Sequence, residues 1–520
     1  MPDHRISAAG LTTRYSEEQP ERDATVSAPV AATDSDHRVQ PVDGRRRGDR
    51  AHHVVPGRMM ACGLQPAPRR PGLRAGGPMV VRGRRHRPVP GTALPGRLGV
   101  HPHCPKWGDP RHVMSGVGVP RCLEDMREHD RRHKVTVIGG GYAGTLAANH
   151  LRMRADIDIT LVNPWPDFVE RVRLHQFVAG TGDATIDYGT LLGEGIQLVV
   201  DTATRIDTAA RAVRLASGRA LSYDHVIYAV GSTAAIPSSV PGAAEFAFPI
   251  ADFDAARRLR ARLAEVPVDA PVTVVGGGLT GVETAAELAE QGRKVTLVGG
   301  GTLVSSWSAP GRRYAARWLS RHGVALLEGD VVTEVRSDAV VLADGTVRSS
   351  TLTIWATGFG VPGLAAASGL RTDTLGRLLT DETLASVDDD RVVACGDAAA
   401  PSGHPLRMSC QAAGALGAQA ANTVLSHIAG VAPAVIDQAL TGSCVSLGRH
   451  TAMRQLARRD DTAVNLYIGG RLGAAIKELT CKVAVSRIRR EARKPGSASW
   501  IKGGRRLEQP ASAAGPVTSP

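Results

Sequence analysis

The segment VTVIGGGYAG (residues 135–144) joins a β-branched run, three glycines and the start of an alanine-rich stretch. A second segment of the same type, VTVVGGGLTG, occupies residues 272–281. Each is typical of a strand that turns tightly into a helix, where backbone N–H groups can face a pyrophosphate. One such segment would be weak evidence for a bound dinucleotide. Two segments, each between a strand and a helix, predict two bound dinucleotides.

The glycines of each segment have separate tasks in this interpretation. The first supplies the tight turn, the third allows close approach of a phosphate, and the last allows the helix to pack against the strand. These residues are Gly139, Gly141 and Gly144, and then Gly276, Gly278 and Gly281. The alternative is a pair of ordinary loops in a chain with 58 glycines, and the matching context of the two segments disfavours it.

The formal charge of +13 in 520 residues belongs to the two ends. Residues 1–125 hold 20 Lys or Arg against 12 Asp or Glu, and residues 471–506 hold 11 against 2. The remainder therefore carries a net charge of −4, so we expect no nucleic-acid partner for the body of the chain. No run of about 18 apolar residues or apolar signal region is present, and a cytoplasmic protein is expected.

Residues 1–127 are rich in Arg, Pro, Gly and His, and residues 51–100 contain no acidic residue. Such a segment buries too little apolar surface to offset its ordering entropy, so we predict a disordered basic extension. It is either an arm for nucleic acid or anionic lipid, or an extension outside the working protein, and the second is favoured.

The seven cysteines are scattered, and none forms a C-x-x-C pair or a zinc-ligand spacing with histidines. We therefore predict no metal site and reduced thiols. None lies between Cys122 and Cys395.

Three further segments complete a resemblance to the pyridine nucleotide-disulfide oxidoreductase superfamily: YAVGS (228–232), IWATGF (354–359) and VVACGDAA (392–399). The first two resemble the chain crossovers of that superfamily, and the third its late flavin motif. The resemblance implies FAD at the first glycine turn, NADH or NADPH at the second, and a hydrogen bond from the ribityl chain to Asp397. It also assigns Arg173, Gly231, Gly358 and Gly396 to the cofactor sites. From the residues alone, Asp397 is equally a helix cap.

The lack of cysteine selects one branch of this superfamily. Disulfide reductases carry a C-x-x-x-x-C pair where this chain reads ITLVNPWPDFVERVRLHQFVAG (159–180), so flavin must pass electrons directly to the acceptor. This segment resembles type II NADH dehydrogenases and related membrane-associated quinone reductases. Their active-site glutamate falls on Glu283, whose alternative role is to complement the dipole of its helix.

Three positions depart from the usual pattern. Asn163 stands where an acid normally binds the ribose of the first dinucleotide. At the second dinucleotide, glycines at residues 299–301 stand where that acid would be, so the choice between NAD and NADP stays open. Arg312 or Arg313 is the expected partner of a 2′-phosphate. Gln411 alone remains of the glutamines that face quinone in type II enzymes; its alternative role is a polar residue at a helix start.

The motifs predict an α/β protein of two Rossmann-like, three-layer dinucleotide-binding domains, the second inserted in the first. The expected segments are an FAD domain at 128–249 and 353–432, an NAD(P)H domain at 250–352, and a small α+β domain at 433–478. Residues 479–520 follow as a basic amphipathic helix and tail, either a membrane-surface helix at the inner face of the membrane or a helix packed on the flavin domain.

These features predict an FAD-dependent NAD(P)H oxidoreductase that reduces a quinone-like or other small acceptor, with a homodimer left open. One alternative is a reductase of a ferredoxin-type protein, with Arg171, Arg173 and Arg407 around an exposed flavin edge. The other is a flavin-stabilised binding protein without redox activity.

Overall fold

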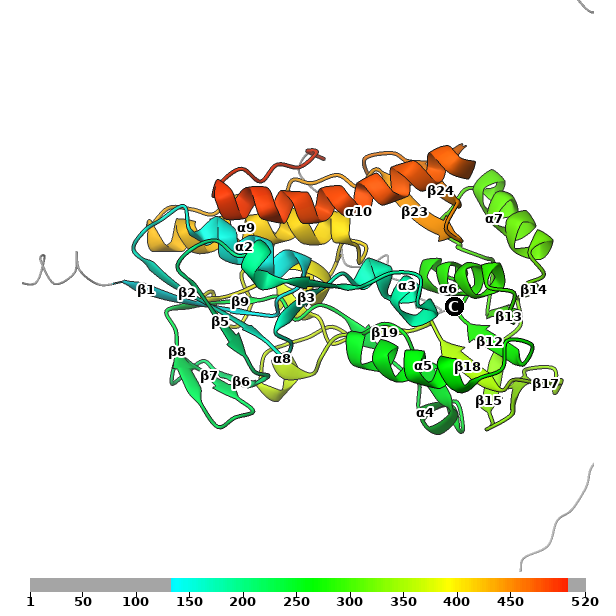
Figure 1. Cartoon of the computed structure of the whole chain (residues 1–520). Coiled ribbons are helices and arrows are strands. Elements are labelled where there is room, and N and C mark those ends of the chain that lie inside the picture. The colour runs from blue at the N-terminus through cyan, green and yellow to red at the C-terminus, as the bar shows by residue number, and fades with distance from the viewer. Residues whose placement is uncertain (1–131, 504–520) are drawn as a thin grey trace, which may run out of the picture. The chain divides into compact units, whose positions relative to one another are not determined.

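A computed structural model describes residues 132–503 of the chain. The predicted disordered extension, residues 1–127, lies outside the described residues, as does the tail after residue 503. Two five-stranded parallel sheets, each with helices packed against it, make up most of the described part (Figure 1).

The first sheet has the strand order β5-β2-β1-β9-β21. Its strands are β1 (His133–Ile138), β2 (Ile157–Asn163), β5 (Ile196–Val200), β9 (His225–Tyr228) and β21 (Val392–Ala394). All four pairings are parallel. Val137, Leu161 and Ile227 are fully buried at its centre, as expected for β-branched and leucine-rich strands covered on both faces.

The second sheet repeats this plan in the order β11-β18-β12-β13-β14. Its strands are β11 (Ala247–Pro249), β12 (Pro271–Val275), β13 (Lys294–Gly299), β14 (Ala325–Glu328) and β18 (Leu352–Trp355), all parallel. The sheet therefore extends beyond the limits of 250 and 352 expected from the sequence, because β11 and most of β18 pair here and not in the first sheet.

Smaller sheets flank the two central ones. One antiparallel three-stranded sheet consists of β6 (Ala203–Asp207), β7 (Ala212–Leu215) and β8 (Ala220–Ser222). A second consists of β15 (Val332–Val335), β16 (Ala339–Leu342) and β17 (Val347–Ser349). A third consists of β23 (Gly442–Leu447), β24 (Thr451–Ala457) and β25 (Ala463–Ile468). Two-stranded pairs are β3 (Asp167–Val169) with β4 (Thr185–Asp187), β10 (Thr233–Ala234) with β19 (Phe359–Gly360), and β20 (Leu378–Thr380) with β22 (Ala399–Pro401).

The helices that matter most for the site follow the glycine turns or close the chain. They are α2 (Tyr142–Leu151), α3 (Leu174–Ala179), α5 (Phe253–Glu265), α6 (Leu279–Glu290), α7 (Ala309–Arg321), α9 (Cys410–Ile428) and α10 (Gly470–Arg493). The short helices α4 (Ala243–Phe246) and α8 (Leu364–Ala367) and the 3-10 turns η1 (Arg171–Arg173), η2 (Tyr188–Thr190) and η3 (Gly396–Ala398) complete the described part.

Small residues bring α2 and α9 into close contact. A side chain at Gly417 of α9 would overlap the carbonyl oxygen of Ala143 in α2. The last helix, α10, runs along α2 and α9 and reaches β23 and β24 (Figure 1). It is one continuous helix across residues 478 and 479, where the sequence suggested a boundary.

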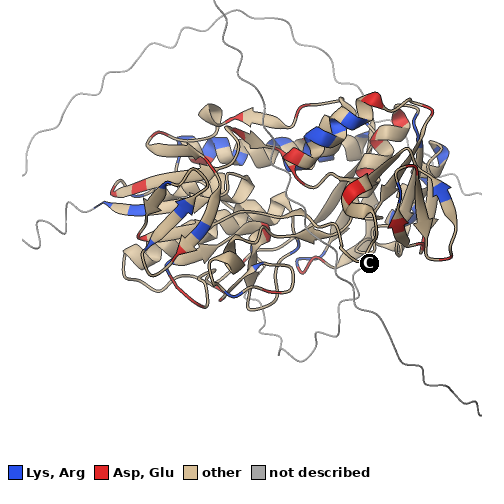
Figure 2. Ribbon diagram, turned by 90° about the horizontal axis from the view of Figure 1, so that it is seen from below, with Lys and Arg blue, Asp and Glu red and all other residues tan. Residues whose placement is uncertain are grey.

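These two parallel sheets with their helices confirm the predicted fold class of two Rossmann-like units. Basic and acidic residues are interspersed along the ribbon of the described part (Figure 2). No described helix is both long and apolar enough to cross a membrane.

Candidate functional site

A cavity of about 710 Å³ lies at the carboxyl edge of the first sheet. Residues that follow four of its strands line this cavity, because the ends of parallel strands meet at one edge. They are Gly139, Gly140 and Gly141 after β1, Asn163 at the end of β2, Gly231 and Ser232 after β9, and Gly396 and Asp397 after β21. Helices α6, α9 and α10 contribute the opposite walls.

The first glycine turn has a backbone that only glycines fit. Gly139 has φ +102°, and a side chain there would overlap the carbonyl oxygen of Ala229. A side chain at Gly144 would overlap the carbonyl oxygen of Gly139, whereas one at Gly141 would meet no atom within 4 Å. No described side chain caps the N-terminus of α2. Open space and uncapped amides at a helix start fit the pyrophosphate of a dinucleotide.

Asn163 is tied to this turn by its side-chain amide. The backbone N–H of Gly140 donates to Asn163 Oδ1 at 2.9 Å, and the Tyr188 hydroxyl donates to the carbonyl of Gly140 at 2.6 Å. Asn163 therefore fixes the turn and faces the cavity from the strand end where an acid is more usual.

The second glycine turn has the same geometry at the carboxyl end of β12. Gly276 has φ +125°, a side chain at Gly281 would overlap the carbonyl oxygen of Gly276, and Gly278 has open space around it. These three glycines lie outside the lining of the 710 Å³ cavity. The helix that they begin, α6, enters the cavity wall through Glu283.

A carboxylate that the sequence did not reveal lies near this second turn. Gly299, the last residue of β13, pairs with Glu328 at the end of β14. The backbone N–H of Leu303 donates to Glu328 Oε2 at 3.3 Å, and Val304 N–H donates to the carbonyl of Gly277 at 2.8 Å. Glu328 thus lies beside the strand end that lacks its own acid.

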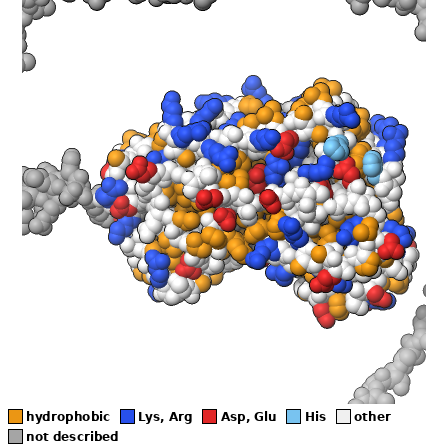
Figure 3. Space-filling view, viewed as in Figure 1, with side chains coloured by type: hydrophobic (Ala, Val, Ile, Leu, Met, Phe, Trp, Pro, Cys, Tyr) orange, Lys and Arg blue, Asp and Glu red, His pale blue; other side chains and the backbone are white. Residues whose placement is uncertain are grey.

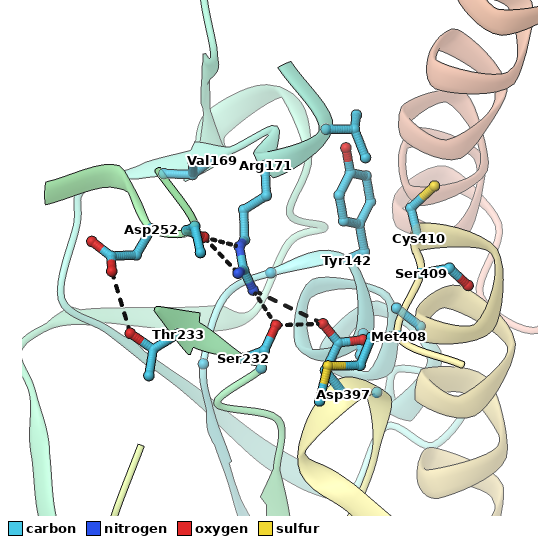
Figure 4. A pocket seen from close by; sticks show the side chains of 18 of the residues that line it. Tyr142, Val169, Arg171, Ser232, Thr233, Asp252, Asp397, Met408, Ser409 and Cys410 are labelled. Atoms are coloured by element: carbon cyan, nitrogen blue, oxygen red, sulfur yellow. Dashed lines mark hydrogen bonds and ion pairs between the residues drawn. The ribbon is translucent and has the colours of Figure 1, made fainter. Parts of the chain in front are cut away.

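Asp397 belongs to a hydrogen-bonded cluster on one wall of the cavity (Figure 4). The Ser232 hydroxyl donates to Asp397 Oδ2 at 2.8 Å, and Arg171 Nη1 donates to Ser232 Oγ at 3.0 Å. Arg171 also donates to the carbonyl of Ala251 from Nε at 3.1 Å and Nη2 at 2.6 Å. Burial lowers the pKa of Arg171, but the nearby carboxylates support its charge. The cluster holds Asp397 in place while leaving it on the cavity surface.

Glu283 is buried in the second turn of α6, not in the first turn of that helix, and is held by three partners. Its Oε1 accepts hydrogen bonds from Lys477 Nζ at 2.7 Å and from the backbone N–H of Ser446 at 2.9 Å. Its Oε2 lies 3.6 Å from His175 Nδ1. Burial opposes the charge of Glu283, but the Lys477 ammonium and the hydrogen bonds from Lys477 and Ser446 outweigh it and hold the pKa of the carboxyl below its usual value.

The pKa values of Lys477 and His175, the two titratable neighbours of Glu283, are also shifted. Burial would lower the pKa of Lys477, yet Glu283 raises it above its usual value, so the pair is ionised. Burial lowers the pKa of His175 to about 4, so this imidazole is neutral near pH 7. All three side chains line the cavity. No local sequence pattern pointed to Lys477, because its partner Glu283 lies on a helix far away in the chain.

The other expected residues fall into two groups. Gln411 lines the cavity, and its Nε2 donates to Thr441 Oγ1 at 3.4 Å. Arg173 lies outside the lining and forms ion pairs with Glu170 and Glu478, each at 3.1 Å. Gly358 also lies outside the lining. The arginine that reaches the cavity from this segment is Arg171, two residues earlier.

Comparison with known proteins agrees with this geometry. The profile of the family described as pyridine nucleotide-disulphide oxidoreductase matches residues 133–417, more than half of the chain. An NADH dehydrogenase-like protein of Mycobacterium tuberculosis is 31% identical over 327 residues, which cover 57% of this chain and 80% of that protein. The type II NADH:quinone oxidoreductase of the same organism is 30% identical over 358 residues, which cover 60% of this chain and 76% of that protein.

The fold is similar to that of solved structures as well. The sulfide:quinone oxidoreductase of Aquifex aeolicus has a TM-score of 0.59 at 17% identity, over 69% of this chain and 92% of that one. The chain belongs to the pyridine nucleotide-disulphide oxidoreductase family. It is an NAD(P)H oxidoreductase, and the predicted enzyme class and the cofactors FAD and NADH or NADPH are confirmed.

Proposed function

We propose that the protein transfers electrons from NADH or NADPH through FAD directly to a quinone-like acceptor. The observation that carries this proposal is the ion pair between Glu283 and Lys477 in the wall of the FAD cavity. It brings the second glycine-turn helix and the last helix of residues 132–503 to the place where the first glycine turn opens.

Within this proposal, FAD would supply, when bound, the transfer of a hydride's electrons from the nicotinamide to the acceptor. The turn around Gly141 binds the pyrophosphate of FAD through backbone N–H groups. Asp397, held by Ser232, accepts a hydrogen bond from the ribityl chain. Lys477 keeps its proton and stabilises negative charge that develops on an acceptor oxygen. Glu283 and Gln411 position the ligands beside it.

We propose a preference for NADH. Glu328 places a carboxylate next to the end of β13, where a 2′-phosphate would have to lie. A carboxylate repels that phosphate and accepts hydrogen bonds from ribose hydroxyls instead.

The ferredoxin-type alternative receives less support. It needs unpaired cations around the flavin edge, but each of the three arginines considered is already engaged. Arg171 donates to Ser232 and Ala251, Arg173 pairs with Glu478, and Arg407 pairs with Asp461.

A peripheral membrane contact through α10 is the second part of the proposal. Leu472 and Leu479 in its first half are exposed by 63% and 60%, and Val483 near its middle is exposed by 38%. Its second half exposes basic residues: Arg487, Arg489, Arg490 and Arg493. Figure 3 shows orange side chains over the first half and blue ones toward the end of the helix. Apolar anchors beside basic residues suit an anionic membrane surface.

Anaerobic stopped-flow spectroscopy of the flavoprotein tests the electron path. NADH should bleach the flavin absorbance, and a following pulse of a quinone should restore it without a protein carrier. Failure of both NADH and NADPH to bleach the flavin would leave only the binding-protein alternative. If a ferredoxin restores the flavin absorbance and a quinone does not, the result would favour a reductase of a ferredoxin-type protein.

Flotation with anionic liposomes tests the membrane contact. The double variant Leu472→Glu and Leu479→Glu should remain at the bottom of the gradient, while the wild type floats. Val268→Glu is the matched control, because Val268 is 54% exposed outside α10. Equal flotation of both variants would overturn this part. The homodimer stays a prediction that sedimentation velocity tests.

A further inference from the structure

Cys444 and Arg454 face each other across two antiparallel strands. They are register partners on β23 and β24, so their side chains leave the sheet on the same side. Arg454 Nη1 donates to Cys444 Sγ at 3.3 Å. Its Nη2 donates to the hydroxyl and the carbonyl of Thr441, at 3.2 and 3.3 Å. The guanidinium is therefore fixed beside the sulfur.

A second cation lies near the same sulfur. Lys477 of α10 interacts electrostatically with Cys444 and lines the same cavity. The Cys444 side chain is half-buried and also forms part of the cavity surface. Positive groups beside a partly exposed sulfur stabilise the negative charge that it carries when it attacks an electrophile.

Two other cysteines line this cavity and also interact electrostatically with Lys477, but burial outweighs that interaction in setting their pKa values. Burial raises the pKa of Cys410 above its usual value and that of Cys481 to about 11. Cys395, fully buried in the first sheet, has a pKa raised to about 12. These three thiols stay protonated near neutral pH, so they serve as internal comparisons for Cys444.

The cavity also offers a hydrogen bond to a ligand. The Tyr142 hydroxyl is buried, and among residues 132–503 it has no hydrogen-bond partner. Tyr142 is 8% exposed, lines the cavity, and interacts electrostatically with Cys410 (Figure 4). A buried hydroxyl without a partner is costly, and a ligand with an acceptor oxygen would remove that cost.

We propose that Cys444 is a covalent addition site for conjugated carbonyl compounds that enter the cavity, including quinones with an unsubstituted ring position. The sulfur forms a bond to the β-carbon, and the electron pair of the C=C bond moves toward the carbonyl oxygen. The proton lost by the thiol returns to the adduct. With a quinone, the product after proton shift is a hydroquinone thioether, so no further oxidant or reductant is needed.

Time-resolved labelling of the oxidised full-length flavoprotein with limiting N-ethylmaleimide, followed by peptide mass spectrometry, tests this proposal. Cys444 should be labelled at least about tenfold faster than Cys481, because Cys444 is only half-buried and its sulfur accepts a hydrogen bond from Arg454, whereas Cys481 is 3% exposed. Arg454→Gln should slow the labelling of Cys444 by about fivefold or more through loss of the charged donor. Arg449→Gln, on the same hairpin, is the control and should leave the rate unchanged.

A second comparison does not depend on the Arg454 variant being folded. 1,4-Benzoquinone should form an adduct on wild-type Cys444 and none on Cys444→Ser, whereas the fully methylated duroquinone should form none on either. Tyr142→Phe should raise the benzoquinone concentration for half-maximal labelling rate. Labelling of Cys444 no faster than of Cys481, or an adduct that survives in Cys444→Ser, would overturn the proposal. No NADH is added, so the outcome is separate from that of the electron-transfer test.

Discussion

Glu283 Oε1 lies 2.7 Å from Lys477 Nζ, although 194 residues separate the two in the sequence. Glu283 lies in α6, the helix after the second glycine turn, and Lys477 belongs to the last helix of the described chain. Their side chains are only 10% and 13% exposed. The ion pair therefore joins α6 to α10 at the cavity, so that the second dinucleotide unit and the C-terminal helix share one wall.

Removal of one partner of this pair should destabilise the protein. Lys477→Met leaves the Glu283 carboxylate buried without its cation, and we expect a loss of about 3–5 kcal/mol in the free energy of unfolding. Urea denaturation at pH 7 measures it. The double variant Glu283→Gln with Lys477→Met removes both charges and should recover much of the loss. A double variant no more stable than Lys477→Met would contradict a coupled ion pair.

His175 should make the protein less stable in acid. Its pKa is about 4 in the folded state, below the value near 6.5 expected in the unfolded chain. The contribution of neutral His175 is therefore complete above pH 6.5 and is lost as the pH falls toward 4, by up to about 3 kcal/mol. His175→Gln should flatten this part of the stability profile, measured by urea denaturation between pH 7 and 4.5. The exposed His322→Gln should leave the profile unchanged.

In the first glycine turn, substitution of Gly144 should lower stability, and substitution of Gly141 should lower FAD binding. Gly144→Ala would press a methyl group against the carbonyl of Gly139, and we expect a loss of about 1–3 kcal/mol in stability. Gly141→Ala meets no protein atom within 4 Å, so it should unfold like the wild type but retain less FAD. Thermal melts and flavin absorbance after gel filtration distinguish the two. Equal flavin content in Gly141→Ala and wild type would count against a phosphate at this turn.

The same comparison applies to the second turn. Gly281→Ala should destabilise the protein, because its methyl group would meet the carbonyl of Gly276. Gly278→Ala should fold normally and bind NADH more weakly, with unchanged flavin content. Fluorescence titration with NADH measures the difference.

Asp397→Asn should weaken FAD binding about tenfold or more, because a neutral amide is a weaker acceptor for a ribityl hydroxyl than a carboxylate. Equilibrium titration of the apoprotein with FAD measures this. Asp344→Asn, in an exposed turn between β16 and β17, is the control. If both variants bind FAD like the wild type, Asp397 has only the structural partner Ser232.

Glu328→Gln should reduce the discrimination against NADPH. Loss of the negative charge beside β13 removes repulsion of the 2′-phosphate, so the ratio of Kd values for NADPH and NADH should fall. The bleaching of the flavin by each nucleotide should follow the same order. An unchanged ratio would show that Glu328 does not face the bound nucleotide.

Much of the fold was predictable because its signals are local. A β-branched run, a glycine turn and an alanine-rich helix specify each Rossmann unit within a few tens of residues. The strand limits were less accessible: β11 and β18 join the second sheet, although the crossover motifs near them suggested the first. The sheet that β11 or β18 joins depends on the strand that it pairs with. A short apolar segment does not specify this partner by its own sequence.

The sequence by itself determined that there are two dinucleotide-binding units, because glycine is strongly favoured where φ is positive and a neighbouring backbone leaves no room for a side chain, as at Gly139 and Gly276. It also placed Asp397 and Glu283 in motifs of known order. Only the tertiary structure decided that Lys477 completes the Glu283 site, that Arg171 and not Arg173 reaches the cavity, and that Arg454 donates a hydrogen bond to Cys444. These relationships join distant segments through packing of α10 and the β23–β24 hairpin, and no local sequence pattern specifies such contacts.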